Sequence, residues 1–241
     1  MPIFLRRVLL GVLLLAGSAL SGVAQPSSGP VPFCEEPQRR QTLDTRGLGA
    51  LYCAPRPALA VTMEAMHASA RPLFYGVVPV AWGVAGVRGG AGAAAAYRLT
   101  LAQGGTYGLV VGLKRLVGRP RPYVRRALTA RADRYGPSKG EKYQAFPSGH
   151  ASVSAALATS VSLTHPRWYV IGPGAAWALG VSLSRLYLGV HYPSDVLVGV
   201  VLGAGIATAI HLARGRITPP RIDGGPGNGG SSAPVGVRIR F

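Results

Sequence analysis

The sequence predicts an all-α protein, a bundle of about five to six helices that cross a membrane. Its 241 residues are 48% hydrophobic, and the hydrophobic residues are gathered in long uncharged runs. Most of these runs come close to the ~20 apolar residues that a helix needs to cross a bilayer. They are also rich in Ala and Gly, which allow helices to pack closely in lipid. The length suits a single domain.

The chain begins with a segment typical of protein export. Arg6 and Arg7 precede the apolar stretch 8–16, and the small residues 22–24 suit a cleavage site. We therefore expect residues 1–24 to be a signal peptide. An uncleaved first transmembrane helix is the alternative, and both options send the next segment out of the cytoplasm.

Residues 25–70 are predicted to be an extracytoplasmic segment rich in Pro and Arg. Both cysteines of the chain, Cys34 and Cys53, fall within it. An oxidising compartment favours a disulfide between them, and two free thiols are the alternative. Two cysteines without nearby paired histidines make a poor metal site, so no metal centre is predicted.

The helices are predicted from apolar runs that charged residues, Pro or Gly interrupt. A short amphipathic helix over 61–70 comes first. The longer runs that follow are 73–87, 91–113, 151–163, 168–183 and 196–213. In the last run, Gly199 and Gly203 form a small-xxx-small pair suited to close helix packing. Because several runs are short for a span, a helical bundle of a soluble protein is the alternative.

Residues 71–213 are thus the predicted helical domain, and 214–241 a Gly- and Pro-rich disordered tail. The tail ends in the strand-like alternation 235–241, to which this architecture gives no role. A cytoplasmic N-terminus with alternating helices places 114–147 and 184–194 outside. The loop 114–147 carries ten Lys or Arg and two acidic residues, against the tendency of positive loops to remain inside.

The charge balance narrows the class of partner. The chain has 26 Lys and Arg against 8 Asp and Glu, for a formal net charge of +18. Such an excess predicts an anionic partner. Nucleic acid is disfavoured because long uncharged runs separate the basic residues. The remaining candidates for the partner are an anionic lipid and a phosphorylated substrate.

The first polar cluster, Lys114–Pro122, follows an apolar run, so Lys114 is expected near a helix end. Lys114 and Arg121 lie seven positions apart and can close on one oxyanion. Lysine supplies a point charge, and arginine a planar fork that matches phosphate oxygens. A basic patch flanking the membrane is the alternative.

The second cluster, Phe146–His150, opens a predicted helix. Ser148 can cap that helix, and Gly149 lets the backbone approach a ligand at a helix start, where free N–H groups attract phosphate. His150 can protonate a leaving oxygen. A simple helix cap followed by a surface histidine is the alternative.

The third cluster, Ser184–Asp195, contains a second histidine and a carboxylate. Pro193 suits the first turn of the next helix, which brings Asp195 close to His191. A carboxylate bonded to one imidazole nitrogen leaves the other nitrogen basic. Arg185 offers another phosphate clamp. A structural His–Asp pair at a helix start is the alternative.

Together the three clusters resemble the motifs of the type 2 phosphatidic acid phosphatase (PAP2) and haloperoxidase superfamily. These motifs are a Lys with Arg-Pro seven residues on, Pro-Ser-Gly-His, and Ser-Arg followed by a His and an Asp. The resemblance covers roughly residues 70–212. It implies a PAP2-like helical bundle with its active site at helix ends on the extracytoplasmic side. The implied activity is hydrolysis of a lipid phosphate monoester or pyrophosphate through a phosphohistidine.

The resemblance also implies a role for each motif residue. His191 attacks phosphorus, Asp195 orients His191, and His150 protonates the leaving group. The residues implied to hold the phosphate are Lys114, Arg121, Ser148, Gly149 and Arg185. No metal or other cofactor is implied for a phosphatase, and vanadate would serve only in a haloperoxidase.

The expected setting is a bacterial-type inner membrane, with the site facing the periplasm and an anionic phosphorylated lipid as substrate. Three alternatives remain at this point. They are a soluble periplasmic acid phosphatase, a vanadium-dependent haloperoxidase and a non-enzymatic binder of anionic lipid.

Overall fold

The computed structural model describes residues 32–35, 41–54, 57–126, 128, 131, 139–219 and 222. Over these residues the protein is all-helical, which confirms the predicted fold class. The expected signal segment 1–24 and the strand-like stretch 235–241 lie outside the described residues.

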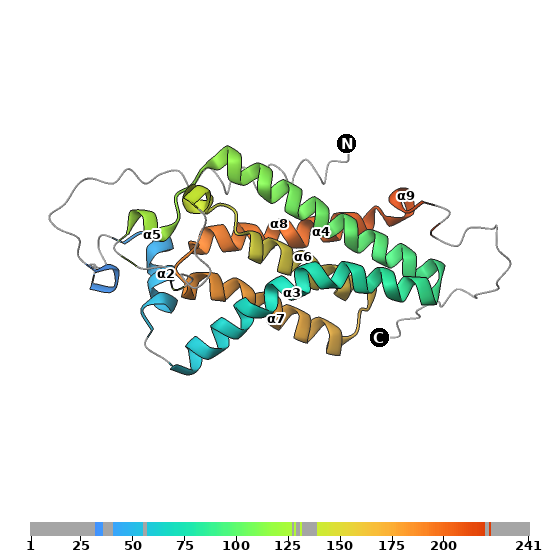
Figure 1. Ribbon diagram of the computed structural model, residues 1–241, viewed down its shortest axis with the longest axis horizontal. Helices are drawn as coiled ribbons and strands as arrows, with labels where there is room; N and C mark the ends of the chain where they lie inside the picture. Colours follow the sequence, from blue (N-terminus) through green and yellow to red (C-terminus); the bar gives the residue numbers. More distant parts are fainter. Residues whose placement is uncertain are drawn as a thin grey trace, which may run out of the picture.

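Within the described residues, five long helices form the body of the molecule. They are α3 Pro57–Arg88, α4 Gly90–Val117, α6 Gly149–Thr164, α7 Trp168–Tyr187 and α8 Pro193–Leu212. The short helices are η1 Phe33–Glu35, α2 Leu43–Tyr52, α5 Pro122–Arg125, η4 Lys139–Tyr143 and α9 Arg214–Ile217. The long helices form an elongated bundle, and α2 lies across one end of it, at the left in Figure 1.

Helix α3 corrects the predicted element boundaries. The stretches 61–70 and 73–87, expected as two helices, belong to one helix of 32 residues that continues through Pro72 and Pro79. A proline inside a helix removes a backbone hydrogen bond and bends the helix. The first part of α3 accordingly slants away from the second in Figure 1, so that α3 reaches both α7 and α4.

Helices α6 and α8 pack backbone against backbone. A Cβ atom placed on Gly203 would lie 1.9 Å from the carbonyl oxygen of Ser152, and one on Gly199 would lie 2.7 Å from that of Ser148. The predicted small-xxx-small pair is therefore the contact between these two helices. At the same end, the Ser148 N–H donates to the Asp195 carbonyl at 2.9 Å, which joins the starts of α6 and α8.

Two of the described helices, α3 and α8, are long and apolar enough to cross a membrane, judged by length and composition. Their apolar side chains also face outward. Val80 and Val84 of α3, and Leu197 and Val201 of α8, are all exposed. An apolar surface of this kind is unusual for a protein in water.

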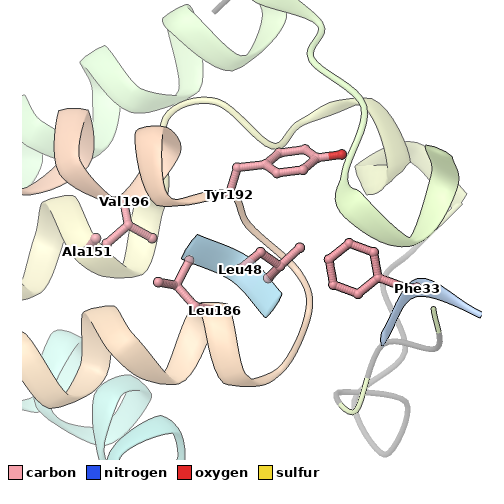
Figure 2. Packing of buried hydrophobic residues seen from close by; sticks show 6 residues of the cluster. All are labelled: Phe33, Leu48, Ala151, Leu186, Tyr192 and Val196. Atoms are coloured by element: carbon pink, nitrogen blue, oxygen red, sulfur yellow. The ribbon is translucent and has the colours of Figure 1, made fainter. Parts of the chain in front are cut away.

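A disulfide-bonded segment covers one end of the bundle. Cys34 of η1 and Cys53 after α2 are joined, with their Cα atoms 5.7 Å apart, so the expected disulfide is present. We call η1, α2 and this bond the cap. The buried cluster that attaches it comprises Phe33, Leu48, Ala151, Leu186, Tyr192 and Val196 (Figure 2). The cap is thereby fixed to the ends of α6, α7 and α8.

Candidate active site

The helix ends that carry the three sequence clusters meet at the capped end of the bundle (Figure 1). Lys114 lies in the last turn of α4, and Arg185 in the last turn of α7. Ser148 and Gly149 stand at the start of α6, while Asp195 lies in the first turn of α8. The alternating topology predicted from the sequence therefore brings together residues that are up to 81 positions apart in the chain.

Three cations converge at this end. The Lys114 ammonium donates a hydrogen bond to the carbonyl oxygen of Gln144. The Arg121 guanidinium lies 3.5 Å from the carboxylate of Glu141, and Arg185 is only 5% exposed. The charges of Lys114, Arg121 and Arg185 act on one another. Buried like charges repel, so this arrangement favours an anion between them.

Five buried polar atoms of the predicted site residues lack a hydrogen-bond partner within the described part of the chain. These atoms are Arg121 Nε, Ser148 Oγ, His150 Nε2, Arg185 Nε and His191 Nδ1. Buried polar atoms nearly always have a partner, because leaving one unsatisfied costs about 1–3 kcal/mol. His191 Nδ1 is turned toward Asp195 Oδ2. The other four atoms suit a tetrahedral oxyanion, which accepts several hydrogen bonds at once.

The position of Ser148 differs from the sequence expectation in one respect. It is the N-cap residue of α6, as predicted, but its side chain makes no capping hydrogen bond. Its hydroxyl is fully buried and belongs to the unpartnered set. Gly149 follows, and a Cβ atom there would lie 3.9 Å from Lys114 Cε. The start of α6 thus lies directly beside the end of α4.

His191 lies in the turn between α7 and α8 and is 2% exposed. Its Nδ1 is 3.7 Å from Asp195 Oδ2, which is close but beyond hydrogen-bonding distance. Burial, followed by the charges of Arg121, Lys114 and Arg185, lowers the pKa of His191 well below its usual 6.5. A neutral imidazole, the form that can act as a nucleophile, is therefore favoured near pH 7.

His150 stands beside two residues of α3 that the sequence analysis missed. Its ring centroid is 5.7 Å from that of His67 and 5.6 Å from that of Phe74. The Nδ1 of His67 also accepts a hydrogen bond from Arg185 Nη1 at 2.7 Å. The sequence does show that His67 and Phe74 are seven residues apart. This spacing is about two helical turns and puts both side chains on one face of α3.

Asp44 of the cap and Arg119 were also missed. Arg119 Nη2 donates to Asp44 Oδ2 at 2.7 Å, and Arg119 Nη1 donates to Asp195 Oδ1. Burial alone would lower the pKa of the Arg119 guanidinium, but Asp195 and Asp44 raise it above its usual value. Arg119 stands in the first sequence cluster, whereas nothing near Asp44 in the sequence indicates a site.

The donor set suits an oxyanion better than a metal ion. Among the described residues, no group of three or more His, Cys, Asp or Glu side chains is placed to hold a metal. Asp44 and Asp195 are both paired with Arg119, and the carboxylate of Glu141 lies 3.5 Å from Arg121. Each carboxylate next to the site is thus paired with an arginine, and the remaining side chains of the site suit a phosphate.

Residues 94–219, more than half of the chain, match the PAP2 superfamily. This chain belongs to the PAP2 superfamily. The match contains all eight motif residues that the sequence analysis selected.

A decaprenylphosphoryl-5-phosphoribose phosphatase of Mycobacterium tuberculosis is 34% identical over 70% of this chain and 92% of its own length. A lipid A 1-phosphatase of Rhizobium johnstonii is 35% identical over 42% of this chain, and the match spans 41% of that protein. A transmembrane PAP2-type phosphatidylglycerolphosphate phosphatase from Bacillus subtilis has the same fold. The TM-score is 0.58, with 22% identity over 88% of this chain and 96% of that one.

The PAP2 match begins at residue 94, inside α4. It therefore includes Arg119 but excludes the cap and α3. Asp44, His67 and Phe74, the three site neighbours contributed by those elements, are outside the region by which the superfamily is recognised.

Proposed function

We propose that the protein is a membrane-embedded phosphatase that hydrolyses a phosphate monoester or diphosphate of an anionic lipid. One observation carries the proposal: three cations converge on a site where five buried polar atoms have no hydrogen-bond partner among the described residues. The similarity to PAP2 proteins named as lipid phosphatases supports it. Lys114, Arg121, Ser148, Gly149 and Arg185 hold the phosphoryl group.

In the first step, His191 attacks phosphorus through Nε2, and the bond from phosphorus to the leaving oxygen breaks. His150 gives a proton to that oxygen. The product leaves as an alcohol or, from a diphosphate, as a lipid monophosphate. Asp195 stabilises the charge that develops on the imidazole. The three cations stabilise negative charge on the equatorial oxygens, which phosphoryl transfer requires.

In the second step, water hydrolyses the phosphohistidine. His150, now neutral, accepts a proton from the water molecule as its oxygen attacks phosphorus. The bond from phosphorus to Nε2 breaks, inorganic phosphate leaves, and neutral His191 is restored. Both proton transfers therefore use the same histidine, and the protein ends the cycle unchanged.

The proposed setting is a bacterial-type inner membrane, with the site on the periplasmic side. The disulfide of the cap supports this side, because Cys34 and Cys53 lie at the same end as the site and disulfides persist in oxidising compartments. The apolar lengths of α3 and α8 support the membrane. Release of the protein by carbonate washing would favour the soluble alternative.

The covalent step is tested by trapping. Purified protein is mixed with a 32P-labelled lipid phosphate, quenched in alkali, and examined for label that is stable to base and labile to acid. We expect label on the wild type and none on His191→Ala, which should still bind phosphate. His165→Ala, at the far end of α6, is the matched control and should keep its label. Turnover by the wild type without label would rule out the phosphohistidine.

A parallel assay separates the two chemistries of the superfamily. Vanadate resembles phosphate in shape and charge, so we expect it to inhibit turnover. Vanadate-dependent oxidation of bromide would instead support the haloperoxidase alternative.

A further inference from the structure

The side chain of Arg119 joins the cap to the start of α8. One nitrogen, Nη2, donates to Asp44 Oδ2 at 2.7 Å, and the other, Nη1, donates to Ser194 Oγ at 2.7 Å and to Asp195 Oδ1. The guanidinium also lies over the Tyr192 ring, 4.5 Å from its centroid. The hydrogen bonds hold the guanidinium at its edge, and the Tyr192 ring packs against its face.

Asp195 depends on this contact for its charge and its orientation. Its side chain is completely buried, and a buried carboxylate is unfavourable unless a cation or several donors face it. Arg119 Nη1 donates a hydrogen bond to Oδ1, and the Tyr192 N–H donates to Oδ2 at 2.8 Å. With both oxygens engaged, the carboxylate keeps Oδ2 toward His191 Nδ1, 3.7 Å away.

Asp44 in turn holds Arg119 and the first turn of α8. Its Oδ1 accepts the Ser194 N–H at 2.9 Å, and its Oδ2 accepts both the Ser194 hydroxyl at 2.6 Å and Arg119. The backbone of α2 lies against the same turn, since a Cβ atom on Gly47 would be 2.8 Å from Pro193 Cγ. The cap therefore holds Asp44 in one defined position beside the first turn of α8.

We propose that Asp44 is a positioning residue of the active site, supplied by the cap, which acts through Arg119 and Asp195 on His191. Asp44 itself does not touch the phosphate. It keeps the Arg119 fork turned toward Asp195, so that Asp195 remains ionised and aimed at Nδ1 and the His191 lone pair remains on Nε2. This inference rests on the proposed function for the role of His191.

The alternative is that Asp44 only attaches the cap to the helical bundle. In that case, its loss would lower the stability of the protein, and a loosened cap would disturb the phosphate-holding residues and His191 together. Positioning affects the attack of His191 on phosphorus and leaves phosphate binding unchanged, because none of the unpartnered polar atoms belongs to Asp44 or Arg119.

The test uses inorganic phosphate as the probe, so it does not depend on which lipid is the substrate. A phosphohistidine formed from phosphate releases water, and its hydrolysis returns an oxygen from the solvent. With 18O-labelled phosphate, the full-length protein in detergent should therefore exchange label with water. The exchange rate reports the attack of His191, and the phosphate concentration at half-maximal rate reports binding.

We expect Asp44→Asn to slow exchange by about tenfold or more, as loss of a supporting group typically does, with half-saturation unchanged. Glu35→Gln is the matched control, because Glu35 is an exposed carboxylate of the same cap, and it should exchange like the wild type. If Asp44→Asn folds poorly, Arg119→Ala serves instead. Added guanidinium ion should then restore part of its exchange.

The outcomes separate the two claims. No exchange by the wild type, or full exchange by His191→Ala, would overturn the proposed function and this inference with it. Exchange by the wild type and by Asp44→Asn at equal rates would overturn the positioning role alone. A parallel loss of rate and phosphate binding in Asp44→Asn, without rescue of Arg119→Ala by guanidinium, would assign Asp44 to fastening the cap.

Discussion

Arg185 Nη1 donates a hydrogen bond to His67 Nδ1 across 2.7 Å, and this contact links the end of α7 to α3 within the site. Arginine has no acceptor, so the nitrogen of His67 that accepts must be unprotonated. The contact fixes one side of a buried guanidinium whose Nε has no partner in the described part of the chain. In the proposed mechanism, this edge of the guanidinium is available to the phosphate.

This contact predicts that His67 supports phosphate binding. Replacing it with Ala removes the acceptor and lets Arg185 rotate. We expect the phosphate concentration needed for half-maximal inhibition to rise about tenfold, which corresponds to the ~1.5 kcal/mol of one hydrogen bond to a charged group. His67→Asn places an amide oxygen near the position of Nδ1 and should recover much of the affinity. Equal inhibition of both variants and the wild type would contradict this role.

The acid limb of the rate profile should depend on Arg121. Protonated His191 cannot attack phosphorus, and burial together with the neighbouring cations lowers the pKa of His191 well below 6.5. The acid limb of kcat/KM, which reports the free enzyme, should therefore lie below pH 6.5. Arg121→Gln removes a cation, so the pKa of His191 rises and the limb moves to higher pH.

The control for this shift is Arg115→Gln. Arg115 is an exposed cation in the same cluster, one residue beyond Lys114, and its loss should leave the limb in place. A uniform loss of rate at every pH in Arg121→Gln would show that Arg121 does not tune His191.

Gly203→Ala should separate α6 from α8. The new Cβ would stand 1.9 Å from a backbone oxygen of Ser152, and backbone cannot move aside cheaply. We expect a loss of about 1–3 kcal/mol in the free energy of unfolding, typical of overpacking, with lower activity because both helices begin at the site. Gly108→Ala is the control, since a Cβ atom there would meet nothing within 4 Å beyond the local backbone of its own helix. Thermal denaturation in detergent measures both variants, and equal stability would contradict this account of the packing.

Removing the disulfide should loosen the cap. The bond closes a loop with a sequence separation of 19, and a loop of about 15 residues contributes ~3 kcal/mol in the chain-entropy account. Cys34→Ser with Cys53→Ser should therefore lower the melting temperature and slow turnover. A reductant should have the same effect on the wild type and none on the double variant. Full activity of the reduced wild type would show that the cap holds without the bond.

The sequence predicted the helix ends of the site well, because they carry local signals. Pro193 begins α8 and Ser148 precedes α6, as their capping chemistry suggests. The alternation of apolar runs then sufficed to bring Lys114, Ser148 and Asp195 to the same end of the bundle. Each of these inferences needed only a few neighbouring residues.

The missed features depend on long-range contacts. Asp44 contacts Ser194 across 150 positions, and His67 contacts Arg185 across 118. No motif near Asp44 indicates such a partner. The spacing of His67 and Phe74 indicates a shared helix face, but it does not indicate Arg185 as the partner. The continuity of α3 through Pro72 was missed for a related reason, since packing against α4 and α7 outweighs the local tendency of proline to end a helix.

The Asp44–Arg119 pair also bears on how the cap and the helical domain change together over evolution. An arginine that shares its charge between two carboxylates tolerates poorly the loss of either one, because a buried ion left without its partner is strongly unfavourable. We expect relatives that retain a cap of this kind to carry an acid at position 44 together with an arginine at position 119. A cap transplanted between such relatives would have to supply an acid at position 44 that matches the arginine at position 119.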